Sequence, residues 1–179
     1  MGLFLQTAIV PGSDEKTVRG VLEGLAPQKD WGLELSECKF VTNDKGVTVL
    51  FNDYCMGFER MAEVLSRETG GDAMLLYIYD GDFWGYFFCE NGALRDQFMP
   101  IPQYFSDDPA KAVPAPGNAA LIAERFHVPA EDVAPYLTTW ALDDLDGAEK
   151  AFEEDEFPYG DCWQMVDFMA KLGWPWPWD

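Results

Sequence analysis

Two successive strand–helix–strand patterns in the first 79 residues restrict the folds open to this chain more than any other feature. Residues Leu3 to Val10 are rich in β-forming side chains and stop at Pro11-Gly12, which favours a strand followed by a turn. The apolar residues that come next recur at the spacing of one helix face: Val18, Val21, Leu22 and Leu25. The first pattern is completed by a strand predicted over residues 33–42.

The second pattern begins with a strand over residues 47–53, after a four-residue turn at 43–46. A helical stripe runs from Phe58 to Leu65, and a third β-rich segment spans residues 73–99 with turns at 80–82 and at Asn91-Gly92. The order predicts an α+β protein, an antiparallel sheet with helices on one face. A ferredoxin-like βαββαβ order with an added hairpin is one arrangement, and a plain antiparallel meander is the other.

The chain changes character after residue 105. Five prolines between Pro100 and Gly117 indicate an irregular connection, and the patterns beyond it are helical. We therefore predict an α+β sheet domain over 1–105, a Pro-rich connection over 106–117 and a helical C-terminal region over 118–179, packed on the first as one globular unit. Helices are expected at 118–126, 129–137, 142–154 and 161–172, before a Trp-Pro tail that alternating prolines keep extended.

The charge balance is strongly acidic. The chain has 12 Lys and Arg against 32 Asp and Glu, which gives a formal net charge of -20. A field of this sign repels nucleic-acid phosphates and anionic lipid and attracts basic proteins and cations. We expect no nucleic-acid or membrane partner. Four widely separated cysteines without a C-x-x-C pair, and a first strand without a basic leader, favour a cytoplasmic location.

Catalytic motifs are missing from the sequence. It contains no G-x-S-x-G elbow, no phosphate-binding glycine loop and a single histidine, His127, which we interpret as a helix-terminal residue. No catalytic residue and no cofactor are therefore predicted. Asp80 and Asp82 flank a glycine at a predicted turn, where they are candidates for binding a divalent cation, although Asp-Gly-Asp is also ordinary turn chemistry. The acidic run at 143–147 lacks the first ligand of an EF-hand loop and is predicted to start a solvated helix.

Aromatic residues are concentrated between positions 77 and 105. Adjacent rings such as Phe83 and Trp84 project to opposite faces of one predicted strand, so both faces of the sheet carry aromatic rings. Either helices cover both faces, or one face is an exposed surface that binds a ligand. Trp84, Tyr86 and Tyr104 are the candidate ligand-binding residues. The Trp-Pro tail has two interpretations as well, a packed lid or an anchor for a partner.

Residues 80–105 resemble a segment of an uncharacterised bacterial protein family. The matching pattern is Asp80-x-Asp82-x-Trp84-x-Tyr86, Asn91-Gly92, Asp96-x-Phe98 and Pro102-x-Tyr104-Phe105. The family has no assigned activity, so the resemblance implies local architecture and supplies no functional residue. Small acidic bacterial proteins of similar general character include immunity proteins of toxin systems.

These observations favour a non-enzymatic acidic interaction protein of immunity or inhibitor type that binds a basic protein. Its predicted contact residues are consecutive: Glu153, Glu154, Asp155 and Glu156. One alternative is a metal-assisted hydrolase that uses Asp80, Asp82 and Asp96. The other is a small-ligand-binding module with an aromatic-lined pocket. The sequence predicts no oligomeric state.

Overall fold

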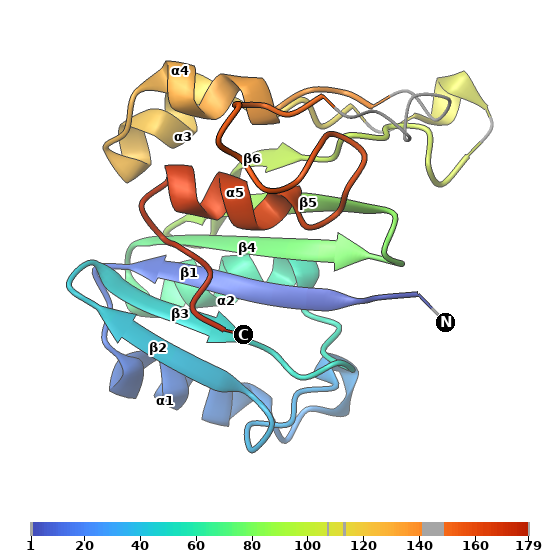
Figure 1. Cartoon of the computed structure of the whole chain (residues 1–179). Helices are drawn as coiled ribbons and strands as arrows, with labels where there is room; N and C mark the ends of the chain where they lie inside the picture. Colours follow the sequence, from blue (N-terminus) through green and yellow to red (C-terminus); the bar gives the residue numbers. More distant parts are fainter. Residues whose placement is uncertain (1, 107, 113, 141–148, 179) are drawn as a thin grey trace. The chain divides into compact units, whose positions relative to one another are not determined.

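The computed structural model describes residues 2–106, 108–112, 114–140 and 149–178 (Figure 1). The chain is α+β, as predicted, with a six-stranded antiparallel sheet in the order β2-β3-β1-β4-β5-β6. The strands are β1 (Leu5–Pro11), β2 (Lys39–Asn43), β3 (Gly46–Leu50), β4 (Asp72–Tyr79), β5 (Phe83–Glu90) and β6 (Ala93–Phe98). The helices are α1 (Glu15–Leu25), α2 (Phe58–Thr69), α3 (Ala119–Phe126), α4 (Ala130–Val133) and α5 (Gln164–Lys171), and the 3₁₀ turns are η1 (Lys29–Trp31), η2 (Pro109–Lys111) and η3 (Ala134–Tyr136).

The strand order confirms the ferredoxin-like alternative. The order β2-β3-β1-β4 is that of a βαββαβ sandwich, and the β5–β6 hairpin continues the sheet beyond β4. β3 lies antiparallel to both β1 and β2, with Leu50 opposite Thr7 and Lys39. The predicted turn at 43–46 joins β2 to β3, and the Asn43 side chain accepts hydrogen bonds from the amides of Lys45 and Gly46.

The chain divides into two compact units. The sheet unit contains Phe4–Tyr77 and Tyr86–Asp96, and the C-terminal unit contains Met1–Leu3, Ile78–Gly85 and Gln97–Asp179. The units do not coincide with the predicted segments 1–105 and 118–179, because the turn between β4 and β5 and the end of β6 group with the C-terminal region. A division along the sequence cannot anticipate this grouping, since strand pairing joins distant segments.

In the sheet unit, α1 and α2 cover one face of the sheet (Figure 1). Their apolar stripes bury Leu22 and Leu65, among others, against alternate strand residues such as Val10 and Val49. Asp14 is the N-cap of α1, and its side chain accepts a hydrogen bond from the Thr17 amide at 2.7 Å.

In the C-terminal unit, α5 packs against Trp84 of β5. The Trp84 ring lies 4.9 Å from Phe168 and 5.1 Å from Phe98, and its Nε1 donates to Gln164 Oε1 at 3.2 Å. Of the four helices expected here, three are confirmed, as α3, as α4 with η3 and as a shorter α5. In the fourth, 142–154, residues 149 and 150 are irregular and residues 151–154 form bends and turns; the acidic run at 143–147 lies outside the described residues.

The structure also bears on two smaller predictions, which concern His127 and the Trp-Pro tail. His127 is exposed and ends α3 as its left-handed C-cap, as interpreted from the sequence. In the tail, Trp174 is buried, and the Trp176 ring lies 5.9 Å from Trp163 and 4.9 Å from Trp178. Within the described part of the chain, no helix combines the length and the apolar character needed to cross a membrane.

Candidate functional site

The turn between β4 and β5 presents the two aspartates selected from the sequence. Asp80 and Gly81 both have left-handed backbone conformations, with φ of 54° and 78°. The turn is held by hydrogen bonds from the Gly81 amide to the Leu3 carbonyl (2.8 Å) and from the Asp82 amide to the Tyr79 carbonyl (3.0 Å). The carboxylates of Asp80 and Asp82 are both exposed. The backbone thus fixes two acidic side chains at one edge of the C-terminal unit.

Tyr104 joins this turn from a distant part of the sequence. Its hydroxyl donates a short hydrogen bond to Asp82 Oδ2. Its ring lies edge-on to Phe83, at 4.8 Å, and to Phe105, at 5.1 Å. The hydrogen bond to Asp82, together with partial burial and the charges of Asp82 and Asp80, raises the pKa of Tyr104 to about 12. Tyr104 therefore stays a donor to Asp82 at any physiological pH.

We refer to the rings and acids at this turn as the Asp82 cluster: Tyr79, Asp80, Asp82, Phe83, Tyr104 and Phe105. Phe83 is fully buried, whereas Phe105 is 60% exposed and packs at right angles on Tyr79, with ring centroids 5.2 Å apart. The cluster thus joins an exposed ring, Phe105, through Tyr104 to the turn that carries the two carboxylates. Ring faces and carboxylates both attract cations.

The other two predicted ligand-binding residues lie elsewhere. Trp84 and Tyr86 are fully buried. Tyr86 belongs to the sheet unit and donates its hydroxyl to Asp96 Oδ2 at 2.6 Å, so both polar ends of these rings are engaged within the protein. Among the described residues, no group of three or more His, Cys, Asp or Glu side chains is arranged to hold a metal ion.

The four predicted partner-binding acids do not share one environment. Glu153, Glu154 and Glu156 are exposed, whereas Asp155 is 6% exposed. Asp155 accepts hydrogen bonds from the Tyr136 hydroxyl, at 2.8 Å, and from the Phe152 amide, at 3.0 Å. Its carboxylate therefore faces the protein interior and orders the segment from which the three glutamates project.

A second carboxylate orders the same segment. Asp167, on α5, accepts hydrogen bonds from the amides of Glu156 and Phe157, the latter at 2.8 Å. Glu154 pairs with Lys171 Nζ at 2.7 Å, and this hydrogen bond lowers the pKa of Glu154. The run is therefore a structured surface segment, with its backbone tied to α5.

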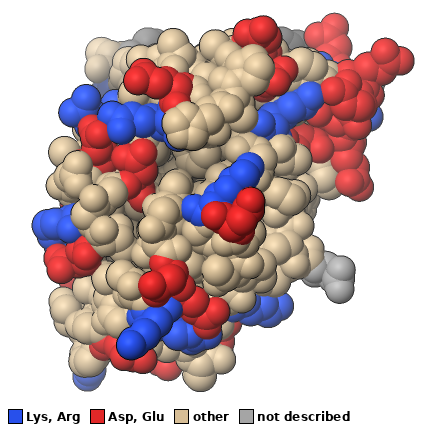
Figure 2. Space-filling model, turned by 90° about the vertical axis from the view of Figure 1, so that its left-hand side faces the viewer, with Lys and Arg blue, Asp and Glu red and all other residues tan. Residues whose placement is uncertain are grey.

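Negative charge is concentrated in the C-terminal unit. Counted from the sequence, this unit has 18 Asp and Glu against four Lys and Arg, a formal charge of −14. The sheet unit has 14 against eight, a charge of −6. On the face drawn in Figure 2, acidic side chains gather at the upper right, whereas most basic side chains elsewhere lie beside acidic ones.

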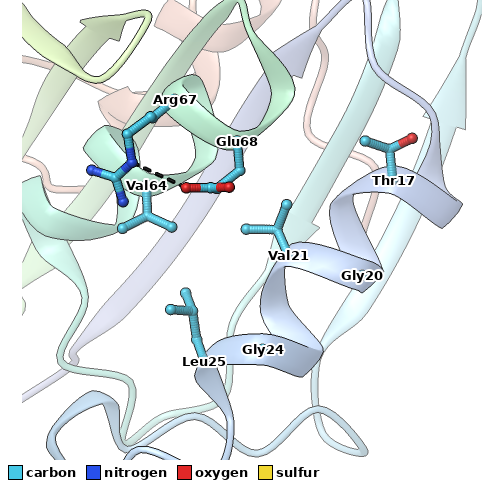
Figure 3. Close-up of a pocket in the computed structure, with 8 residues that line it drawn as sticks. All are labelled: Thr17, Gly20, Val21, Gly24, Leu25, Val64, Arg67 and Glu68. Carbon is cyan, nitrogen blue, oxygen red and sulfur yellow. Dashed lines mark hydrogen bonds and ion pairs between the residues drawn. The ribbon is translucent and has the colours of Figure 1, made fainter.

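Sequence reasoning missed a hollow of about 460 Å³ between α1 and α2 in the sheet unit (Figure 3). Val21 and Leu25 of α1 and Val64 of α2 form its apolar wall, and Arg67 pairs with Glu68 at 3.0 Å on its edge. Gly20 and Gly24 leave room along α1, since an added Cβ would meet nothing within 4 Å at either position. The available signal was the pair of glycines four residues apart in a predicted helix.

Comparisons with protein-family models, with curated proteins and with solved structures find no match to this chain.

Proposed function

We propose that this chain is a non-enzymatic acidic interaction protein that binds a basic protein partner in the bacterial cytoplasm, in the manner of an immunity protein or inhibitor. The observation that carries the proposal is the ordered acidic segment in a unit of charge −14. Glu153, Glu154 and Glu156 are exposed on a backbone that Asp155 and Asp167 hold in place.

Order in this segment favours binding. A charged loop that must be ordered on association loses conformational entropy, and that loss weakens the complex. Here the internal hydrogen bonds of Asp155 and Asp167 have already fixed the backbone of the glutamates. Charges presented in this way accelerate encounter with a basic surface and select against acidic ones.

The test starts with capture of partners from native host lysate at low salt, with salt elution and identification by mass spectrometry. The bait is then replaced by the triple variant Glu153→Gln, Glu154→Gln and Glu156→Gln. Exposed ion pairs contribute about 0.2–1 kcal/mol each, so we expect the triple variant to bind the identified partner about threefold to 150-fold more weakly.

The matched control removes three exposed acids from the sheet unit, Glu23→Gln, Glu34→Gln and Glu37→Gln. It changes the net charge equally, so it measures the effect of the general field alone. Equal weakening by both triple variants would show that residues 153–156 form no specific contact. Retention of no basic protein by the unaltered bait would contradict the proposed function.

A further inference from the structure

One arrangement occurs several times in this protein: a Lys or Arg side chain lies over an aromatic ring and also pairs with a carboxylate. In the sheet unit, the Arg19 guanidinium lies 3.8 Å from the centre of the Phe40 ring and its Nε is 2.7 Å from Glu15. Arg60 lies 4.4 Å from the centre of the Trp31 ring and is 3.0 Å from Asp30. The ring and the acid hold the cation from two sides.

The C-terminal unit repeats the arrangement with a lysine. Lys171 Nζ lies 3.7 Å from the centre of the Phe152 ring and 2.7 Å from Glu154. The hydrogen bond to Glu154 raises the pKa of Lys171 and keeps it charged. Three times, then, a ring and an exposed or half-buried acid are completed by a cation of the chain itself, and one of the rings, Trp31, is buried.

In the Asp82 cluster, the acids Asp80 and Asp82 and the rings of Tyr104 and Phe105 have no such cation from the described part of the chain. Among the residues that the structure describes, no Lys or Arg pairs with Asp80 or Asp82, and none lies over the ring of Tyr104 or Phe105. Phe105 is the most exposed phenylalanine described, and the neighbouring Tyr104 both packs against it at 5.1 Å and donates its hydroxyl to Asp82. The acceptor and the ring are therefore in position before any cation arrives.

We propose that the Asp82 cluster binds an arginine side chain of the basic partner, with the guanidinium stacked on Phe105 and paired with Asp82 and Asp80. This inference rests on the proposed function and names the chemistry of one contact. Arginine fits better than lysine because its planar guanidinium is weakly hydrated, stacks on rings and offers several donors to a carboxylate. The negative field of the C-terminal unit draws such a side chain toward the cluster.

The experiment measures binding of oligoarginine and oligolysine peptides of equal length to the full chain at low salt. Affinity is followed by titration calorimetry, and the contact is located by amide chemical shifts. We expect the arginine peptide to bind about twofold to fivefold more tightly than the lysine peptide, with the largest shifts at Asp82, Tyr104 and Phe105.

Phe105→Ala should abolish the preference for arginine while leaving the affinity for oligolysine within about twofold, since the ring rather than the charge is removed. Phe105→Leu, which keeps an apolar side chain, should behave like the alanine variant. The double variant Asp80→Asn, Asp82→Asn should weaken oligoarginine binding more than the charge-matched control Glu153→Gln, Glu156→Gln. Melting temperatures of all variants verify that the fold is retained.

An arginine preference that survives Phe105→Ala, or shifts that are absent from the cluster, would overturn this inference. If both peptides still bind and only the Glu153 and Glu156 changes weaken them, the inference fails while the proposed function stands. If neither peptide binds the unaltered chain, both this inference and the proposed function are contradicted.

Discussion

Asp155 shows how one residue in a run of acids acquires a structural role. It is flanked by exposed glutamates, yet its carboxylate accepts the Tyr136 hydroxyl and the Phe152 amide, and Lys150 Nζ donates to its carbonyl oxygen at 2.7 Å. Burial is the main cause that raises the pKa of Tyr136, and the hydrogen bond to Asp155 is the second. The raised pKa keeps the Tyr136 hydroxyl protonated, so it remains a donor to Asp155. The pair links the acidic segment to the core of the C-terminal unit.

Asp155→Asn should therefore destabilise the protein without removing an exposed charge from the partner surface. The asparagine side chain has the shape of the aspartate, but one of its two oxygens is replaced by an NH2 group. Asp155 accepts hydrogen bonds from two donors, the Tyr136 hydroxyl and the Phe152 amide, so the variant loses one of these hydrogen bonds at a cost of about 1–3 kcal/mol. Urea unfolding of the variant and of the control Glu156→Gln, whose effect should stay within about 0.5 kcal/mol, provides the measurement. Equal stability of the two variants would contradict the internal role of Asp155.

The sequence alone could not separate Asp155 from its neighbours. Four consecutive acids favour a solvated stretch, and the inward turn of one of them depends on Tyr136, which is 19 residues away. The same reason hid the Asp82 cluster, because Asp82 and Tyr104 were selected separately and for different roles. Only the folded chain brings the turn carboxylate and the Pro-Tyr-Phe exit together.

The four cysteines are free thiols, and all four are buried. Burial raises the pKa of Cys55 and Cys162 to about 11 and that of Cys89 to about 12, from an ordinary value of 9.0. Above pH 9 the unfolded chain loses thiol protons that the native protein keeps. The native state then binds more protons, so stability must fall as pH rises.

We therefore expect the free energy of unfolding to be constant with respect to these thiols below pH 9 and to decrease between about pH 9 and pH 11. Tyr104, whose pKa is raised to about 12, extends the loss toward pH 12. Urea unfolding at several pH values, with a thiol reagent applied to the native protein, checks both the trend and the burial. Stability that is unchanged or higher at pH 10.5 than at pH 8 would refute this account.

At the scale of elements, α1 carries two glycines that its own packing does not require. Gly20 and Gly24 are exposed, and a Cβ at either position would meet no atom within 4 Å. Glycine inside a helix costs about 0.5–1 kcal/mol relative to alanine because it has more conformational freedom to lose. The two residues therefore lower the stability of α1 and open the hollow beside α2.

Gly20→Ala and Gly24→Ala should each raise the free energy of unfolding by about 0.5–1 kcal/mol, as measured by urea denaturation. Gly46→Ala is the opposite control: its Cβ would lie 2.4 Å from the Val10 carbonyl oxygen, at a φ of +151°, so it should destabilise the β2–β3 hairpin. Destabilisation by either α1 substitution would mean that the hollow is filled or that α1 packs differently.

Local signals were sufficient for most elements of the sheet unit. Apolar periodicity located α1 and α2, and the turns at 43–46 and Asn91-Gly92 defined two hairpins, because these signals are short-range. The segment 142–154 was less well predicted. Its described part, residues 149–154, is not helical, since Asp155 and Asp167 accept backbone amides that stabilise an irregular path.

At the scale of the whole molecule, the charge distribution defines the expected mode of action. The formal charge of -20 is shared unequally, with −14 on the C-terminal unit and −6 on the sheet unit. The four basic residues of the sheet unit with a described ion pair all bind acids of the same unit, as Arg19 and Arg60 do. The total charge was evident from the sequence, but its division between units required the contacts of the folded chain.

The salt dependence of partner binding tests the central claim most directly. The affinity of the captured basic protein would be measured at about 0.05 M and about 0.5 M salt, between which the screening length falls from about 14 Å to about 4 Å. We predict binding at least about tenfold weaker at the higher salt concentration, mostly through a slower association rate. An affinity that does not change with salt would contradict recognition through the acidic surface.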